Sequence, residues 1–305
     1  MRSNWQHGPD ETQLQVIDVA RHHVTWFGGR KIVWLAWGNG PPVVLLHGGF
    51  GSWTHFLDLI PILSERMTLW CPDMPGFGDS DMPLPGELTH TIPAALADGI
   101  FKLVPDREVD VIGFSFGTAM AGLLCGVLAG NSAGPSPRKL LLFAPSALGV
   151  EMARISGEHR LPPGLSRHER LAVHKNNLSL VMLSSEHCVD DRTVALQDVN
   201  VRRTRVRGRN ISRSSALHDI LATHPARELA ATWGGADPYL KDRHCAYMRV
   251  LRDLYPGADL LVQEGIGHWV QHEAAADTAS FALRFLQAPV QGASANTTSK
   301  QSERL

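Results

Sequence analysis

Short apolar runs alternate with longer, mostly apolar segments along most of this chain. The runs that we expect to form buried strands lie at residues 42–47, 68–72, 108–114 and 138–144, and again from about 228 and 259. The segments that we expect to form helices lie near 53–63, 89–103, 116–129 and 273–287. Alternation at this spacing predicts an α/β fold in which a mostly parallel sheet carries helices on both faces.

The two ends of the chain follow other patterns. Residues 12–37 show the two-residue period of strands, first in Leu14–Val19 and then in Lys31–Leu35. We therefore expect an antiparallel ribbon at one edge of the sheet. Residues 288–305 are rich in Ser, Thr, Gln and Asn. This composition predicts a disordered tail, because it cannot bury enough apolar surface to fold.

Composition excludes several classes of protein. The chain has 29 basic and 30 acidic residues, so no global charge favours nucleic acid or an anionic membrane. No apolar run reaches 18 residues, and Met1–Asp10 lacks the apolar core of a signal peptide. The four cysteines are far apart in sequence, and we expect them to be reduced and structural, which suits the cytoplasm.

The segment Gly113-Phe114-Ser115-Phe116-Gly117 carries the strongest chemical signal. An apolar strand pattern precedes it and a buried helix pattern follows it. Strand, Gly-x-Ser-x-Gly and helix in this order put a serine on a sharp turn with its hydroxyl exposed. The glycines are expected because a side chain at either place would collide with a neighbouring strand or helix. Ser115 is therefore the predicted nucleophile.

Three further segments follow strand patterns in the order that such a serine enzyme requires. His47-Gly48-Gly49 follows the strand at 42–46, Asp237 follows the strand at 229–233, and His268 follows the strand at 259–263. The chain order Ser, acid, His is that of one hydrolase fold. From about residue 12 to about 287, the sequence resembles the α/β-hydrolase superfamily.

The resemblance implies a division of the chain. Residues 1–147 and 226–287 would form the α/β-hydrolase core. Residues 148–225 lack strand patterns and favour helices over 167–183 and 193–207, so they would form a helical lid inserted after the sixth strand.

Each predicted catalytic residue has a defined role and a structural alternative. His268 would take the proton of Ser115, and Asp237 would orient its ring. The alternatives are a turn histidine packed beside Trp269 and an N-cap at Asp237, whose following proline suits a first helical turn. The backbone N–H of Phe116, the residue after the nucleophile, would bind the oxyanion.

The family's His-Gly-x segment implies Gly49 as the second oxyanion donor, with Phe50 left open. Aromatic residues flank these positions, and Phe50, Phe114 and Trp269 are candidate contacts for an apolar substrate or else packing residues. Arg203 and Arg207 are one helical turn apart and are candidates for binding an anionic substrate group; the alternative is a solvated helix face.

Other chemistries lack their motifs. There is no phosphate-binding loop with its lysine, and the third glycine of a dinucleotide fingerprint is missing. No His-Glu-x-x-His occurs, so we expect neither a metal nor a cofactor. Family members that cleave carbon–halogen bonds or epoxides have an aspartate as nucleophile, and Ser115 argues against both activities.

The predicted activity is hydrolysis of a carboxylic ester or lactone of a small hydrophobic substrate, with aromatic substrates included. Gly267-His268-Trp269, with Gln271 and Glu273, resembles the carbon–carbon bond hydrolases of aromatic degradation. Those enzymes usually carry Gly-Asn-Ser-x-Gly-Gly, whereas this chain has Phe114 and Thr118 at the variable places. A perhydrolase, an acyltransferase and a non-enzymatic receptor stay as alternatives. The expected partner is a small molecule, with a homodimer left open.

Overall fold

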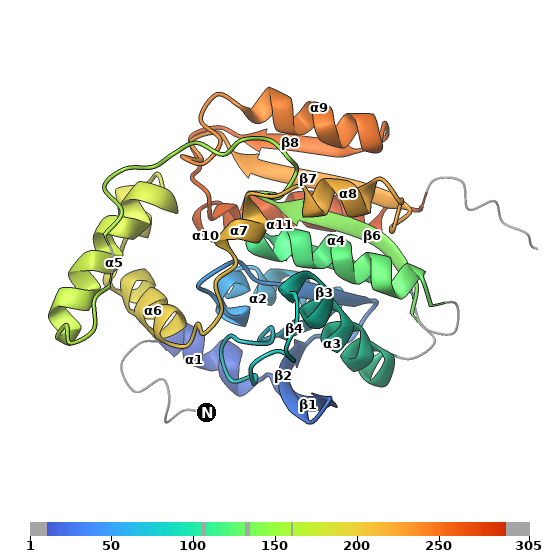
Figure 1. The fold of residues 1–305 in the computed structure, drawn as a ribbon, viewed down its shortest axis with the longest axis horizontal. Coiled ribbons are helices and arrows are strands. Elements are labelled where there is room, and N and C mark those ends of the chain that lie inside the picture. Colours follow the sequence, from blue (N-terminus) through green and yellow to red (C-terminus); the bar gives the residue numbers. More distant parts are fainter. Residues whose placement is uncertain (1–10, 105–107, 132–134, 160, 291–305) are drawn as a thin grey trace, which may run out of the picture.

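The computed structural model describes residues 11–104, 108–131, 135–159 and 161–290, and a single sheet runs through its centre (Figure 1). Within these residues the sheet has eight strands in the order β1-β2-β4-β3-β5-β6-β7-β8. β2 is antiparallel to β1 and to β4, and the other pairs are parallel. The predicted mostly parallel sheet is confirmed. The strands are β1 (Arg21–Phe27), β2 (Arg30–Trp37), β3 (Pro42–Leu46), β4 (Thr68–Pro72), β5 (Val109–Phe114), β6 (Pro137–Phe143), β7 (Glu228–Gly234) and β8 (Asp259–Gln263).

Helices cover both faces of the sheet, as the alternation predicted (Figure 1). Buried residues of α3, α4, α8 and α9 pack on one face. Those of α1, α2 and α11 pack on the other. The helices are α1 (Glu11–Asp18), η2 (Trp53–Phe56), α2 (Ile60–Leu63), α3 (Leu88–Leu103), α4 (Phe116–Ala129), α5 (Arg167–Val181), η3 (Glu186–Cys188), α6 (Asp191–Arg202), α7 (Arg209–Ser212), α8 (Ala216–Leu221), α9 (His244–Leu254), α10 (Val270–Glu273) and α11 (Ala275–Gln287).

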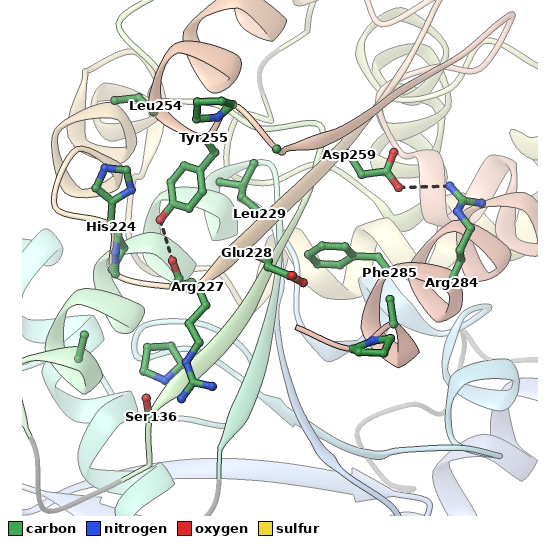
Figure 2. A pocket seen from close by; sticks show the side chains of 18 residues that line it. Ser136, His224, Arg227, Glu228, Leu229, Leu254, Tyr255, Asp259, Arg284 and Phe285 are labelled. Carbon is green, nitrogen blue, oxygen red and sulfur yellow. Dashed lines mark hydrogen bonds and ion pairs between the residues drawn. The ribbon is translucent and has the colours of Figure 1, made fainter. Parts of the chain in front are cut away.

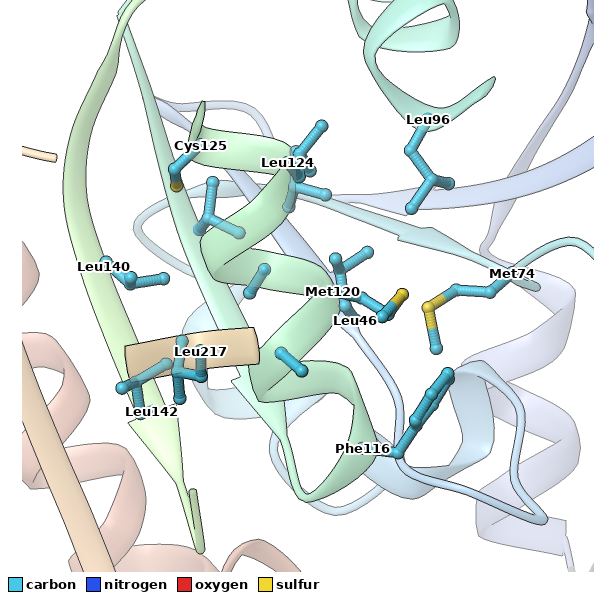
Figure 3. Close-up of a cluster of buried hydrophobic side chains, with 14 of the residues drawn as sticks. Leu46, Met74, Leu96, Phe116, Met120, Leu124, Cys125, Leu140, Leu142 and Leu217 are labelled. Carbon is cyan, nitrogen blue, oxygen red and sulfur yellow. The ribbon is translucent and has the colours of Figure 1, made fainter. Parts of the chain in front are cut away.

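Helix α4 is the most deeply buried helix near the predicted nucleophile. Met120 and Leu124 are fully buried in one cluster with Leu140 and Leu142 of β6 (Figure 3). Removing a large buried side chain of this kind costs about 2–5 kcal/mol, since the space left behind does not close fully. This packing fixes the helix, and with it the position of Ser115 at its start.

Residues 148–225 lie between β6 and β7 and, in their described part, contain helices and no strand. We call this segment the insert. Its helices α5 and α6 stand beside the sheet (Figure 1) and are joined where Arg170 Nε donates to Asp198 Oδ1 at 2.8 Å. Helix α8 packs differently: Leu217 is buried against α4, where a Cβ on Gly122 would lie 2.6 Å from it. By its packing, α8 belongs to the helix layer of α4.

The sequence pattern misassigned one element. Leu14–Val19 was expected to be a strand but lies mostly in α1. Val16 and Ile17 are adjacent and both buried, whereas Val19 is 71% exposed. Neighbouring residues of a strand point to opposite faces, so this burial fits a helix face instead. Trp37 Nε1 donates to the carbonyl of Val16 at 2.7 Å and holds the helix against β2.

One helix of the insert is shorter than the sequence pattern predicted. The helix predicted over 193–207 ends at Arg202. Beyond it, the N–H of Arg205 donates to the carbonyl of Gly76 at 2.9 Å. A Cβ on Gly76 would lie 2.4 Å from Val206, so the chain is in tight contact with the core there. Residues 203–207 thus pack against the core instead of continuing the predicted helix.

The predicted disordered tail lies, from residue 291 onward, outside the described residues. In the parts of the chain that the structure does describe, no helix combines the length and apolar character needed to cross a bilayer.

Candidate active site

The carboxyl ends of parallel strands bring the predicted site residues together. β3 leads into Gly49, β5 into Ser115, β7 into Asp237 and β8 into His268. Because β3, β5, β6, β7 and β8 are neighbours in that order, these four loops leave the same edge of the sheet. Open α/β sheets bind their ligands at this edge.

Ser115 occupies the sharp turn that its motif predicted. Its backbone has φ 50° and ψ −118°, a conformation that costs a residue with a side chain about 1–3 kcal/mol. Two hydrogen bonds hold this backbone conformation. The N–H of Ser115 donates to the carbonyl of Phe143 at 2.9 Å. Ser146 Oγ donates to the carbonyl of Ser115 at 3.1 Å. The neighbouring strand β6 and the segment after it thus stabilise the turn.

The two glycines of the motif are required by close approach. A Cβ on Gly113 would lie 2.6 Å from the carbonyl oxygen of Gly117. A Cβ on Gly117 would lie 2.2 Å from the carbonyl oxygen of Leu46, on the adjacent strand. Both distances are well inside van der Waals contact, so the steric reason inferred from the sequence is present in the structure.

Ser115, His268 and Asp237 form a continuous chain of hydrogen bonds. Ser115 Oγ lies 2.9 Å from His268 Nε2. On the other side of the ring, His268 Nδ1 lies 2.6 Å from Asp237 Oδ2. His268 is 3% exposed and Asp237 is 1% exposed, so water does not compete for the contact between them. This arrangement lets the ring take a proton from the serine while the carboxylate stabilises the resulting charge.

The helix-cap alternative for Asp237 does not match the geometry. The next helix, α9, begins only at His244, with Arg243 as its N-cap residue. The second carboxylate oxygen of Asp237 accepts from the N–H of Tyr239 at 2.8 Å, within a turn. That bond orients the carboxylate and leaves its other oxygen for His268.

Gly49 and Phe116, the predicted oxyanion donors, lie next to each other. A Cβ on Gly49 would be 3.8 Å from the Cβ of Phe116. Phe116 is the first residue of α4, and an N–H in that position has no acceptor within its own helix. The partial positive charge at the helix start adds to its ability to bind an oxyanion. Phe50 follows in a left-handed conformation, with φ 54°.

His47, at the end of β3, is a buried neutral residue beneath this loop. Burial lowers the pKa of His47 to about 4. Its Nδ1 donates to the carbonyl of Gly48 at 2.9 Å, and its Nε2 accepts from the N–H of Met74 at 3.1 Å. Both bonds are possible only when the ring carries a single proton, on Nδ1.

The three predicted aromatic contacts lie in different environments. Phe50 is 46% exposed. Phe114 has no exposed surface, and Trp269, 1% exposed, donates from Nε1 to the carbonyl of His55 at 2.9 Å. Phe114 and Trp269 therefore fit the packing alternative, and substrate contact stays a prediction that the geometry favours for Phe50 alone.

The arginines of the insert do not form the predicted common face. Because α6 ends at Arg202, Arg203 and Arg207 are not one helical turn apart. Arg203 forms an ion pair with Asp79 of the core, whereas Arg207 is exposed. Arg205 donates to the carbonyl of Ser80. The prediction that Arg203 and Arg207 share a face was wrong, and two of these arginines bind the insert to the core.

Sequence reasoning missed the polar residues that join the insert to the site loops. Asn200 of α6 is buried, accepts from Ser52 Oγ at 2.9 Å and donates to Thr54 Oγ1 at 3.0 Å. Ser52 and Thr54 lie just after the Gly49 loop. An asparagine inside a helical pattern gives no signal of such a contact, because its partners are about 150 residues away in sequence.

Glu273 makes a similar connection on the other side. Its carboxylate accepts from the N–H of Gly267 at 2.8 Å, one residue before His268. It also accepts from the N–H groups of Ser184, at 3.0 Å, and Ser185, at 2.5 Å, beyond the end of α5. The loop that carries His268 is thus tied to the insert. The only sequence signal was the position of Glu273, five residues after His268.

A second histidine and carboxylate pair lies nearby. His272 Nδ1 is 2.5 Å from Asp58 Oδ2, and His272 Nε2 is 3.1 Å from Thr193 Oγ1. Thr193 is 1% exposed, so its hydroxyl is shielded from solvent. Arg192 pairs with the same carboxylate at 2.7 Å. We assign this group to the contact between α6 and the core.

A groove of about 770 Å³ lies far from Ser115, at the amino end of β7 (Figure 2). Its charged side chains are paired: Arg284 with Asp259, Arg227 with Glu108, and Glu228 with Lys139. Among the lining residues that the structure describes, the four charged side chains thus all have a partner of opposite charge. Among the described residues, no cluster of three or more His, Cys, Asp or Glu side chains is arranged to hold a metal ion.

The chain belongs to the alpha/beta hydrolase family, whose model matches residues 43–281. The match runs from β3 into α11 and includes the four loops of the site. The class of fold and the class of enzyme inferred from the sequence, an α/β hydrolase, are therefore shown.

Individual relatives differ in activity. The soluble epoxide hydrolase of Corynebacterium sp. (strain C12) is 35% identical over 100 residues, which are 33% of this chain and about a third (35%) of that protein. The 2-hydroxy-6-oxo-6-phenylhexa-2,4-dienoate hydrolase of Burkholderia cepacia is 25% identical over 265 residues, 82% of this chain and 88% of that protein. A solved meta-cleavage product hydrolase from Pseudomonas fluorescens IP01 has a TM-score of 0.68 at 19% identity, covering 87% of this chain and 97% of its own. Its likeness shows the fold alone.

Replacing Asp237 by Asn tests the orienting role of the carboxylate. We expect the protein to stay folded, while kcat for ester hydrolysis falls by about 10⁴-fold, because an amide no longer holds the required tautomer of His268. The control is Asp219→Asn, which alters an exposed pair with His218 (3.0 Å). Comparable kcat values in Asp237→Asn and the parent would exclude the role.

The buried His47 predicts a pH dependence of stability. Its pKa is lowered from 6.5 to about 4 in the folded protein, so only the unfolded chain binds a proton between these values. Stability is therefore lost as the pH falls through this window, by about 3 kcal/mol in total.

The variant His47→Asn keeps a donor near Gly48 but has no group that titrates. Urea unfolding should show the variant less stable than the parent at pH 7.5. That deficit should shrink by about 2–3 kcal/mol at pH 4.5, because only the parent loses the stability that depends on a neutral His47. A deficit that does not change with pH would refute the assignment. The exposed His22→Asn controls for loss of a histidine in general.

Proposed function

We propose that this chain is a serine hydrolase that cleaves a carboxylic ester or lactone of a small hydrophobic substrate, aromatic substrates included, through an acyl-enzyme. One observation carries the proposal: the hydrogen-bonded chain from Ser115 Oγ through His268 to Asp237. A serine hydroxyl is a weak nucleophile until a neighbouring base takes its proton, and His268 Nε2 is in position to do so.

The acylation step follows from this geometry. As Ser115 Oγ attacks the carbonyl carbon, its proton passes to His268 Nε2, and Asp237 stabilises the charged ring. The negative charge that develops on the carbonyl oxygen is bound by the N–H groups of Phe116 and Gly49. His268 then gives its proton to the departing alcohol oxygen as the carbon–oxygen bond breaks.

Deacylation repeats the same steps with water. His268 takes a proton from a water molecule, the hydroxide attacks the acyl carbon, and Ser115 Oγ departs with the proton returned by the ring. The same two N–H groups stabilise the second oxyanion. A different acceptor in place of water would make the enzyme a perhydrolase or acyltransferase, and the chemistry on the protein side is identical.

Epoxide hydrolysis is the activity of one relative, but the nucleophile argues against it here. Family members that open epoxides use a carboxylate that attacks carbon. Ser115 occupies the turn in this chain, and its contact with His268 suits removal of a proton from a hydroxyl.

Carbon–carbon bond hydrolysis is the second candidate. It is favoured by the Burkholderia cepacia relative, whose similarity extends over 82% of this chain. Against it stand Phe114 and Thr118, which differ from the elbow that such enzymes usually carry. Phe114 is fully buried, so the difference affects packing beneath Ser115.

Turnover of a substrate panel by the parent and by Ser115→Ala tests the proposal. The panel holds p-nitrophenyl esters of short and aromatic acids, a small lactone, and 2-hydroxy-6-oxo-6-phenylhexa-2,4-dienoate. We expect ester or lactone turnover, lowered at least ~10³-fold in the variant.

Near-normal turnover by Ser115→Ala would eliminate the serine mechanism. Preference for the dienoate over every ester would replace the first candidate by the second. A cytoplasmic location and a homodimer stay predictions from the sequence.

A further inference from the structure

His55 lies beneath the predicted oxyanion loop, and no sequence motif includes it. It is the third residue of η2 and is 1% exposed. Its ring packs edge-on against Phe114, with ring centres 5.3 Å apart, and against Trp269, with ring centres 4.9 Å apart. The residue thus touches the strand that ends at Ser115 and the loop that follows His268.

His55 and His47 each bind one of the two peptide groups that flank Gly48. The N–H of Gly48 donates to His55 Nδ1 at 3.1 Å. The carbonyl of Gly48 accepts from His47 Nδ1 at 2.9 Å. The C=O and N–H of a trans peptide point in opposite directions. The bond from His47 therefore fixes the direction of the N–H of Gly49, and the bond to His55 fixes the preceding peptide. Both peptide planes of Gly48 are held only when both bonds are present.

The backbone of His55 connects the same loop to the catalytic histidine. Its carbonyl oxygen accepts from Trp269 Nε1 at 2.9 Å and from Gln271 Nε2 at 3.2 Å. Trp269 is the residue after His268. His55 therefore contacts both the predicted oxyanion loop and the loop that carries His268.

We propose that His55 is a positioning residue that holds Gly48, and through it the N–H of Gly49, in the orientation that binds the oxyanion. The inference rests on the proposed serine-hydrolase function. His55 does not touch the reacting atoms, and it acts through the backbone of Gly48.

The protonation of the ring agrees with this role. Burial, followed by the nearby His47, His268 and His272, lowers the pKa of His55 well below 6.5. Nδ1 is then free to accept, and the ring proton lies on Nε2. Among the described residues, Nε2 is buried without a hydrogen-bond partner. A phenylalanine would fill this space without an unpaired donor, so packing alone does not explain a histidine here.

Gly51 makes room for the ring. A Cβ at this position would lie 2.1 Å from His55 Cε1 and 2.4 Å from His55 Nδ1. The backbone of Gly51 is not in the left-handed region, and the three atoms nearest to an added Cβ all belong to the His55 ring. The substitution Gly51→Ala therefore displaces His55 without changing any polar group.

The test compares His55→Asn with His55→Leu. The two new side chains have nearly the same shape, and both remove the ring contacts with Phe114 and Trp269. Only Asn offers an oxygen near the place of Nδ1, where the N–H of Gly48 can donate to it. Three quantities are measured: kcat and KM on the best ester, affinity for a trifluoromethyl ketone that adds to Ser115, and the thermal midpoint of unfolding.

We expect both variants to lose similar thermal stability. In His55→Leu, kcat and the affinity for the trifluoromethyl ketone should fall ~10²–10³-fold with little change in KM, the loss typical for one oxyanion donor. His55→Asn should recover most of both values, and Gly51→Ala should behave like His55→Leu. Equal losses in the Asn and Leu variants would overturn the inference and leave a structural role.

A spectroscopic readout separates this inference from the proposed function. In protein labelled with ¹⁵N, a hydrogen bond from Gly48 N–H to His55 Nδ1 gives a scalar coupling between the two nitrogens. We expect this coupling in the parent and its absence in Gly51→Ala. A parent without the coupling refutes the positioning role even if it is an active esterase. A parent with the coupling that turns over no ester and does not react with the ketone refutes the proposed function, and the role in an oxyanion hole fails with it.

Discussion

The strained backbone of Ser115 is the constraint on which the rest of this site depends. With φ at 50°, the residue keeps its conformation only because the surrounding structure holds it there. The N–H of Ser115 binds the end of β6, and Gly113 and Gly117 allow β5, β3 and α4 to approach closely. The buried packing of α4 then supplies the stability that offsets the strain. The Ser115 hydroxyl fixed in this way already lies within hydrogen-bonding distance of His268 Nε2.

Around Ser115, Asp237 carries a buried negative charge, and the nearby buried histidines His47 and His55 are neutral. Asp237 is buried and divides its oxygens between His268 and the N–H of Tyr239. His47 and His55 are neutral and act as hydrogen-bonding groups of the loop. Arg203 pairs with Asp79, so this arginine joins the insert to the core. Neutral hydrogen-bonding groups therefore lie beside the N–H groups that we propose bind an oxyanion.

The sequence predicted those parts of the molecule that depend on short-range sterics. Gly113 and Gly117 are needed for local clearance, so the motif around Ser115 could be read without the fold. The order of Asp237 and His268 after their strands was enough to predict which loops meet. The insert was harder to predict, because α6 ends at Arg202 and the chain then bonds from Arg205 to Gly76, a contact that no local pattern contains.

The sequence also did not predict which aromatic side chains are buried. Aromatic residues at 114 and 269 looked equally suited to substrate or core, and only the fold shows that both are buried. Val16 and Ile17 were assigned to a strand because alternation over six residues does not distinguish a short helix from an edge strand. His55 had no signal at all, since its partners Gly48, Phe114 and Trp269 lie in three separate segments of the chain.

The central claim is that Ser115 becomes acylated, and trapping the intermediate tests it most directly. The protein is mixed with a p-nitrophenyl ester, quenched in acid within milliseconds, digested and examined by mass spectrometry. The account predicts an acyl group on the peptide that contains Ser115, formed in a burst equal to the enzyme concentration when deacylation is slow. An acyl group on another residue, or ester turnover without any acylated peptide under conditions that give a burst, would contradict it.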